Sequence, residues 1–233
     1  MTSLICLTYY DALQVHREVV APQLARCGLH ATFYLPVGYD DLHLHLERWR
    51  KVAQMGHELG NHSIWHPCRT RLEWDWKPTY RLEEYDRNRI RDELSMANRV
   101  LHLIDRKNIR SYAATCGDLT CGPGNGESFV NDIQDLFAVV RAGHITRPIQ
   151  RPAEFVVPAL MGDFHHADEI IKIVEKMKNI SDSWLVVVMH GVGVGTHNSY
   201  IDSSEHTSLI EWIVSQRNWL EATTMLEAVE LRK

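Results

Sequence analysis

The first residues of the chain alternate between a strand, a helix and a second strand, and this order restricts the fold more than any other feature. Residues 3–9 are apolar and rich in residues that favour strands, so they predict a buried strand. Apolar residues then recur at helical spacing over 15–27 and end at Gly28. Residues 31–36 predict a second strand. Because so short a helical connection joins parallel neighbours, we expect an α/β fold with a parallel sheet.

The rest of the chain continues this alternation. Strands are expected within 109–118, 136–140, 155–158 and 184–193, and helices over 42–55, 82–105, 167–178, 203–216 and 224–232. The segment 184–193 is the most apolar of these strands. No repeat, linker or low-complexity tract interrupts the pattern. The 233 residues are therefore expected to form one domain over 1–233.

Composition and charge exclude several classes of protein. The formal net charge of −5 gives no reason to expect nucleic-acid binding. No long apolar segment predicts a membrane span, and no signal peptide precedes the first strand. We therefore expect a cytoplasmic protein, or a secreted one if the chain is a piece of a longer protein. Nothing in the sequence predicts the oligomeric state.

The cysteines favour reduced thiols over a disulfide framework. Their number is odd and their spacing follows no framework; they are Cys6, Cys27, Cys68, Cys116 and Cys121. A cysteine-rich zinc site is the alternative, since Cys116 and Cys121 are close in sequence. No Cys-x-x-Cys pair supports it.

Residues 56–67 read Gly-His-Glu-Leu-Gly-Asn-His-Ser-Ile-Trp-His-Pro. Since His62 and His66 are four positions apart, one helical turn or a tight loop aims both imidazoles at one point. Two imidazoles begin a transition-metal site, which needs a third ligand from elsewhere and, for catalysis, an open position for water. The spacing alone is short and common, and surface or core histidines show it too.

Two further polar residues follow predicted strands. Asp11 comes after the first strand, and His190 follows the most apolar strand and precedes glycines. In parallel sheets the functional site lies at the carboxyl ends of the strands. Both residues are therefore candidates for the same site. The simpler alternatives are a turn carboxylate and a strand-end histidine bonded to a neighbour.

The run 56–67 resembles the second motif of the polysaccharide deacetylases, the NodB-homology domain of carbohydrate esterase family 4. There, Gly-His-Glu-(Ile/Leu)-(Gly/Ala)-(Asn/Ser)-His-(Ser/Thr)-x-x-His supplies two metal histidines. The resemblance extends to Leu-Thr-Tyr-Tyr-Asp-Ala at 7–12, which stands where the family has Thr-Phe-Asp-Asp-Gly. It includes Ala-Thr-Phe-Tyr at 31–34, and His190 stands at the histidine of the family's fifth motif, Leu-x-x-His.

The resemblance implies a distorted (β/α) barrel with fewer than eight strands. It also implies a divalent metal, most often zinc, held by Asp11, His62 and His66. The reaction would be hydrolysis of an N- or O-acetyl group on a sugar, with the metal polarising the carbonyl and His190 protonating the leaving group. His57 would help to orient the metal ligands.

Two positions depart from the family pattern. Tyr10 stands where the family has its base aspartate, and Ala113 stands where the third motif has the arginine that orients this base; only Gly117 of that motif remains. Because base and arginine are absent together, we expect a changed mechanism. Either hydroxide formed at the metal or Asp118 replaces the base, and the enzyme is slow. Tyr10→Asp is then expected to restore activity only in part.

An aromatic loop over 69–85 contains Trp74 and Trp76, which are expected to stack on sugar rings or, alternatively, to cap the barrel. Two other functions stay open at this point. One is a weak or inactive carbohydrate-binding relative that kept the metal. The other is a metal-dependent hydrolase of another amide or ester.

Overall fold

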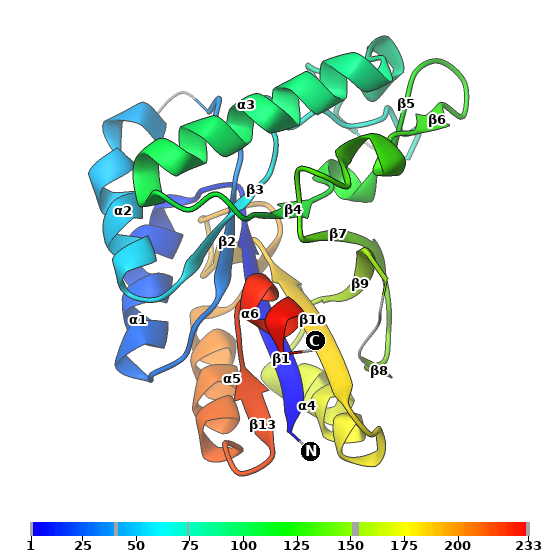
Figure 1. The fold of residues 1–233 in the computed structure, drawn as a ribbon. Helices are drawn as coiled ribbons and strands as arrows, with labels where there is room; N and C mark the ends of the chain where they lie inside the picture. The colour runs from blue at the N-terminus through cyan, green and yellow to red at the C-terminus, as the bar shows by residue number, and fades with distance from the viewer. Residues whose placement is uncertain (1, 40–41, 74, 151–153, 232–233) are drawn as a thin grey trace.

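Seven parallel strands close into a barrel in the computed structural model of the chain, which describes residues 2–39, 42–73, 75–150 and 154–231 (Figure 1). The barrel order is β1, β2, β3, β4, β7, β9 and β10, and pairing of β10 with β1 closes the ring. The barrel strands are β1 (Ser3–Tyr10), β2 (Thr32–Leu35), β3 (Glu58–Asn61), β4 (Ser111–Ala113), β7 (Val139–His144), β9 (Val156–Met161) and β10 (Ser183–Met189). The predicted barrel with fewer than eight strands is confirmed.

The first strand shows why these segments are continuously apolar. Successive side chains of a strand point to opposite faces. Leu4, Cys6 and Tyr10 belong to the buried cluster inside the barrel, whereas Ile5 and Leu7 belong to the cluster under the surrounding helices. Because both faces are covered, a parallel strand of this kind has no polar face.

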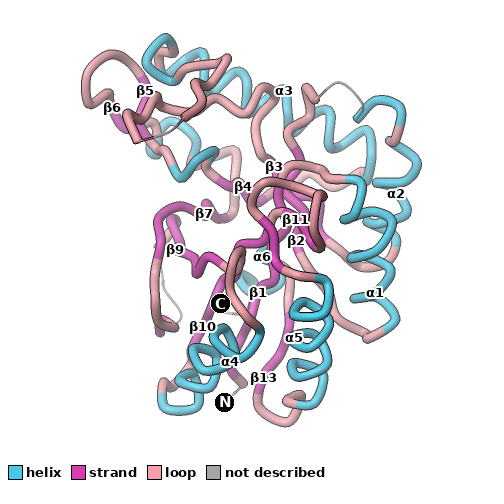
Figure 2. Tube along the Cα trace, turned by 180° about the vertical axis from the view of Figure 1, so that it is seen from behind, coloured by secondary structure: helices cyan, strands magenta, loops and turns pink. Residues whose placement is uncertain are grey.

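Helices surround the barrel in both views (Figures 1 and 2). They are α1 (Ala21–Arg26), α2 (Leu46–Gln54), α3 (Arg87–Asp105), α4 (Ala167–Glu175), α5 (Ser203–Ser215) and α6 (Met225–Glu230). The last helix packs against the inner cluster instead, and its first residues bond to strand residues: Met225 N donates to Thr32 Oγ1 and Leu226 N donates to Glu58 Oε2, both at 3.0 Å. Thus α6 closes the amino-terminal end of the barrel. Among the described residues, no helix has the length and apolar character needed to cross a bilayer.

Short elements complete the fold. The strands outside the barrel are β5 (Thr120–Cys121), β6 (Glu127–Ser128), β8 (Ile149–Gln150), β11 (Gly191–Val192), β12 (Tyr200–Ile201) and β13 (Leu220–Ala222). The short helices are η1 (His16–Val20), η2 (Leu42–Leu44), η3 (Leu82–Glu84), η4 (Thr115–Gly117), η5 (Val130–Ile133) and η6 (Lys176–Asn179). Both views place the β5–β6 hairpin near α3, at the opposite end of the molecule from α4, α5 and β13.

Several element boundaries differ from the sequence predictions. The segment before His62 is strand β3, which was not predicted, whereas His62 to His66 form a loop, one of the two predicted alternatives. The first predicted helix is divided into a π-helix, η1, and α1. Strand β9 runs to Met161, beyond the predicted end at Pro158, because Pro158 is tolerated within it. Because β9 ends at Met161 and not at Pro158, Asp163 lies just beyond its carboxyl end.

A buried ion pair fixes the end of α3 to the barrel. Asp105 and Arg110 form two hydrogen bonds of 2.6 and 2.5 Å, and each side chain is 1% exposed. Arg110 also donates to the carbonyl of Leu59 in β3 at 3.0 Å. The pair therefore joins the segment that enters β4 to the neighbouring strand. Removing one partner of such a pair leaves an uncompensated buried charge.

We expect Asp105→Asn to lower the free energy of unfolding by about 3–5 kcal/mol, because Arg110 then loses its counter-charge. The matched control is Asp168→Asn, which breaks an exposed pair with Lys172 (64% and 69% exposed). Exposed pairs contribute at most about 1 kcal/mol. Urea unfolding followed by circular dichroism measures both, and an equal loss in the two variants would contradict this account of Arg110.

Candidate metal centre

A cavity of about 1300 Å³ lies at the carboxyl ends of the barrel strands. Its lining includes Tyr10 and Asp11 at the end of β1, His62 and His66 after β3, and His190 after β10. The structure therefore brings together the three predicted metal ligands, the predicted acid His190, and Tyr10, which stands at the position of the family's base.

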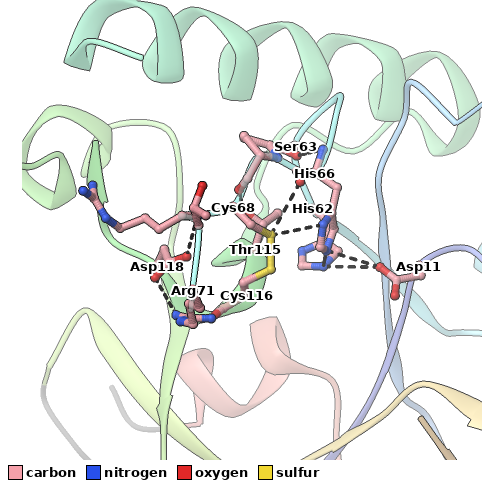
Figure 3. The surroundings of a disulfide bond; sticks show 12 residues. Asp11, His62, Ser63, His66, Cys68, Arg71, Thr115, Cys116 and Asp118 are labelled. Carbon is pink, nitrogen blue, oxygen red and sulfur yellow. Dashed lines mark hydrogen bonds and ion pairs between the residues drawn. A yellow bond between two sulfur atoms is a disulfide. The ribbon is translucent and has the colours of Figure 1, made fainter. Parts of the chain in front are cut away.

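The turn after β1 brings Asp11 to the two histidines. Asp11 and Ala12 have left-handed backbone conformations, with φ of 73° and 53°, so the chain bends sharply at the end of the strand. Oδ1 of Asp11 lies 3.6 Å from Nε2 of His62 and 3.5 Å from Nε2 of His66 (Figure 3). This oxygen is buried and has no hydrogen-bond partner among the described residues.

The loop after β3 aims both imidazoles at that oxygen. Ser63 and His66 have positive φ angles of 67° and 52°, and two hydrogen bonds hold these kinks: Ser63 N donates to Asn61 Oδ1 at 2.7 Å, and His66 N donates to Ser63 Oγ at 2.9 Å. Nδ1 of His62 donates to the carbonyl of Ala113 at 2.8 Å. We therefore assign the proton of His62 to Nδ1, which leaves the lone pair of Nε2 facing His66.

These three side chains fit a divalent transition metal. Nε2 of His62 and Nε2 of His66 are 3.1 Å apart, and all three ligand atoms lie within 4.8 Å of one another. Burial, and then the charge of His66, lowers the pKa of His62 well below its usual value, so this imidazole is neutral and free to bind metal. Burial alone would raise the pKa of Asp11, but the surrounding imidazoles outweigh it and lower that pKa. Two neutral imidazoles and a carboxylate suit zinc.

Asp163 holds His190 at the opposite side of the cavity. The backbone N–H of His190 donates to Asp163 Oδ1 at 2.8 Å, and Nδ1 bonds to Oδ2 at 2.6 Å. Burial alone would lower the pKa of His190, but the hydrogen bond and the charge of Asp163 outweigh it and raise that pKa. Because Nδ1 is occupied, Nε2 is the nitrogen left for a ligand in the cavity.

His197 lies between His190 and the metal-ligand candidate Asp11. Its ring stacks on His190 with centroids 5.2 Å apart. Its Nδ1 lies 3.0 Å from both the backbone nitrogen and the carbonyl oxygen of Ser199, and its Nε2 lies 3.7 Å from Asp11 Oδ2. His197 therefore lies directly beside the Asp11 carboxylate.

Tyr10 forms the floor of the cavity and has no exposed surface. Its hydroxyl accepts a hydrogen bond from Arg141 Nε at 2.8 Å and lies 3.3 Å from Thr8 Oγ1. Thr8 has one proton and donates it to the carbonyl of Val187 at 2.7 Å, so its oxygen is left to accept from Tyr10. Burial raises the pKa of Tyr10, although Arg141 and Thr8 act in the opposite direction. The phenol therefore stays protonated at neutral pH.

Arg141 is a functional candidate that the sequence did not indicate. It lies in β7, in register with Ala113 of β4, and lines the cavity. It is buried, and its guanidinium carbon lies 4.8 Å from the centre of the Tyr10 ring. In the part of the chain that the structure describes, it forms no ion pair. The position of Ala113 carries no arginine, but Arg141 on the adjacent strand places a guanidinium beside it.

The remaining predicted residues have different positions. His57 lies at the start of β3, and its nitrogens bond to Ala31 N and Ala21 O at 3.2 and 3.0 Å. These contacts do not support the prediction that His57 orients the metal ligands, since both ring nitrogens are bonded to backbone groups of other residues. Trp76 lines the cavity and is 46% exposed, whereas Trp74 lies outside the described residues.

Asp118 does not line the cavity within the described part of the chain. Its carboxylate accepts from Arg71 Nη2 at 2.7 Å and from Arg69 N at 3.0 Å, on the far side of the disulfide in Figure 3. This position does not support it as a substitute base. Asp163 was missed because Pro158 shortened the predicted strand, and only a longer strand would have placed Asp163 at its carboxyl end.

The expectation of reduced thiols is wrong for two of the five cysteines. Cys68 and Cys116 form a disulfide that joins the loop after β3 to η4, 48 residues further along the chain. Cys6, Cys27 and Cys121 are free. The bridge lies directly beside His66, whose Nδ1 is 3.5 Å from Cys68 Sγ.

Comparisons with known proteins identify the family and the fold of the chain. The family model described as polysaccharide deacetylase matches residues 2–121. A family 4 acetyl xylan esterase from Clostridium thermocellum, solved with a cobalt ion, has a TM-score of 0.61 at 18% identity and covers 99% of this chain and 92% of its own.

Two further solved structures have the same fold. A CE4-family pseudoenzyme from Bacillus anthracis has a TM-score of 0.59 at 15% identity, over 98% of this chain and 66% of its own. A peptidoglycan deacetylase from Bacillus subtilis has a TM-score of 0.54 at 14% identity, over 99% and 92%. No curated protein sequence matches the chain.

We expect Asp163→Asn to lower the pKa of His190, because it removes the negative charge that stabilises the imidazolium. NMR titration of the histidine C–H signals measures this pKa, and His190→Ala identifies the signal. Asp135→Asn, which removes an exposed carboxylate paired with Arg91, is the control and should leave the titration in place. An unchanged or higher pKa in Asp163→Asn would show that Asp163 does not set the protonation of His190.

Proposed function

Since the chain belongs to the polysaccharide deacetylase family, we propose that it hydrolyses acetyl groups, N- or O-linked, on a sugar or polysaccharide. The observation that carries this proposal is the convergence of two sets of groups on one cavity. Asp11, His62 and His66 offer three metal-binding atoms at one side, and His190 presents a free nitrogen at the other. Hydrolysis of an acetyl group needs both an electrophilic activator and a proton donor.

Asp11, His62 and His66 would hold a divalent metal, and the nitrogen and oxygen donors favour zinc. When bound there, such an ion polarises the acetyl carbonyl and activates water for attack on it. Contacts within the chain orient these metal ligands before any ion binds. The Ala113 carbonyl sets the tautomer of His62, and His197 lies beside Asp11 on the other side.

His190 would act as the general acid. Asp163 fixes its ring through Nδ1 and raises its pKa, so that the protonated form is present near neutral pH. Its Nε2 then donates a proton to the departing amine or alcohol. His190 is assigned this role because it lines the cavity and because Asp163 favours its protonated form. Asp163 itself is fully buried.

The same geometry argues against a base at position 10. The Tyr10 hydroxyl has its proton directed to Thr8, its oxygen bonded to Arg141 and its pKa raised by burial. General-base assistance contributes roughly 10²–10⁴-fold to a rate, so its loss produces a slow enzyme rather than an inert one. We therefore propose a weak deacetylase.

Aromatic side chains suit a saccharide at the rim of the cavity. Tyr39, Trp65, Trp76 and Tyr80 all line it, and the rings of Trp65 and Tyr80 stack with centroids 5.2 Å apart. Sugar rings pack well on such flat, amphipathic surfaces. This supports Trp76 as a substrate-binding residue.

An inactive carbohydrate-binding relative is the second candidate. The buried, hydrogen-bonded Tyr10 favours it, and one solved structure of the same fold is that of a pseudoenzyme. The deciding experiment is acetate release from N- and O-acetylated saccharides with zinc present, with His190→Ala as the control. Release that disappears in His190→Ala supports the deacetylase. Binding of saccharides without acetate release supports the second candidate, and hydrolysis of other amides or esters alone would contradict both.

We expect His66→Ala to lose bound zinc, because it removes one of three converging ligands. His43→Ala is the matched control, since His43 is an exposed histidine in η2. Elemental analysis after dialysis against zinc measures the metal content of each. Equal zinc content in the two variants would remove His66 from the site.

We expect Tyr10→Asp to raise the rate of acetate release, within the roughly 10²–10⁴-fold range of general-base assistance. Arg141 changes the earlier expectation that Ala113 leaves this carboxylate without an arginine, because Arg141 already reaches position 10. Arg141→Met in the Tyr10→Asp background should therefore remove most of the gain.

Tyr10→Phe is the control, because it keeps the ring and removes the hydroxyl. It should leave the slow wild-type rate nearly unchanged. A robust wild-type activity that Tyr10→Phe abolishes would show that the hydroxyl takes part in the reaction.

A further inference from the structure

His66 faces two different sets of metal-binding atoms. Its Nε2 points to His62 and Asp11, as described above. Its Nδ1 lies 3.5 Å from Sγ of Cys68, on the opposite edge of the ring (Figure 3). His66, Cys68 and Cys116 form a second group whose ligand atoms all lie within 4.8 Å of one another.

We propose that reduction of the Cys68–Cys116 disulfide opens a second metal site, in which both thiolates and Nδ1 of His66 bind a thiophilic divalent cation such as Zn²⁺ or Cd²⁺. A dithiol supplies two electrons and two protons to the bridge and becomes a cyclic disulfide itself. The two new thiols then release their protons to solvent as the cation binds. The oxidised chain has no such site, because disulfide sulfurs are poor ligands.

The backbone around the bridge is held independently of the S–S bond. Thr115 Oγ1 donates to the carbonyl of Pro67, so the residues immediately before the two cysteines are joined to each other. On the other side, Arg71 Nη2 donates to the Cys116 carbonyl at 3.2 Å. Both loops therefore stay together when the bridge opens, and the two thiols remain neighbours.

The dimensions also suit a metal. Zn–S bonds of about 2.3 Å place two sulfurs of a tetrahedral site roughly 3.8 Å apart. The Cα atoms of Cys68 and Cys116 are 5.7 Å apart, so rotation of the side chains is enough to open the sulfurs to that separation. Two thiolates and an imidazole form a softer donor set than two imidazoles and a carboxylate, and they select zinc and cadmium over harder cations.

A reductant reaches the bridge from the cavity. Cys116 lines the cavity, whereas Cys68 is fully buried. The dithiol therefore attacks Sγ of Cys116, forms a mixed disulfide there and expels the Cys68 thiolate beside His66. The first free thiolate thus appears next to the imidazole that completes the new site.

The two sites compete for one residue. A neutral imidazole has one lone pair, on either Nδ1 or Nε2, so His66 serves one site at a time. A cation in the second site withdraws His66 from Asp11 and His62. This consequence, unlike the second site itself, rests on the proposed function, and it would make the enzyme sensitive to the redox state of its surroundings.

The test is titration of the full chain with Co²⁺, once oxidised and once reduced with a dithiol that is removed under nitrogen before metal is added. A sulfur-to-cobalt charge-transfer band is expected in the reduced chain alone. Cys6, Cys27 and Cys121 are free in both states, so they act as an internal control. The band should be lost in reduced Cys116→Ala and weakened in His66→Ala.

The band should persist in reduced Asp11→Asn, which damages only the first site, so this arm is independent of deacetylase activity. No band in the reduced wild type, or an equal band in the oxidised one, would overturn the proposal without requiring any variant to fold. A band that His66→Ala leaves unchanged would also overturn it, because the cation would then be held without His66.

Discussion

Pairing between β1 and β10 is the interaction on which the rest of the structure depends. These strands run parallel and in register from Leu4 with Trp184 to Tyr9 with Met189, which closes the barrel. Since Tyr9 lies level with Met189, the residues that follow, Tyr10, Asp11 and His190, reach the same edge together. The two functional halves of the cavity are therefore adjacent because the ring is closed. A shift of one residue in this register would turn Tyr10 out of the barrel.

The barrel also orients the imidazole rings that it brings together. Backbone groups fix the two metal-binding histidines: the Ala113 carbonyl in β4 sets the proton of His62, and the loop after β3 turns through left-handed residues to bring back His66. A side chain, Asp163, fixes His190 in the same way from the end of β9. Such partners occupy the nitrogen that faces away from the cavity, so the remaining lone pair or proton faces inward.

Part of this site could be predicted because Asp11 and His190 follow strands whose sequences are apolar, which made them candidates for one site. The spacing of His62 and His66 alone did not distinguish a metal site, and the roles of all four residues came from the resemblance to the family motifs. Arg141 and Cys116 could not be found in this way. The partner of Arg141 depends on the register of β7 against β4, and that of Cys116 on two loops 48 residues apart. Contacts between distant segments are not encoded in local periodicity.

The position of Arg141 changes the meaning of the two departures from the family pattern. Because the base at position 10 and the arginine at position 113 are absent together, the sequence predicted a changed mechanism that uses neither residue. The cation, however, is present one strand away, buried and bonded to the residue that replaced the base. Burying a guanidinium that has no ion-pair partner among the described residues is costly, and one hydrogen bond to a phenol offsets only part of that cost. The cavity around Tyr10 therefore keeps a positive charge directed at the place where a carboxylate, or the developing negative charge of a reaction, would be stabilised.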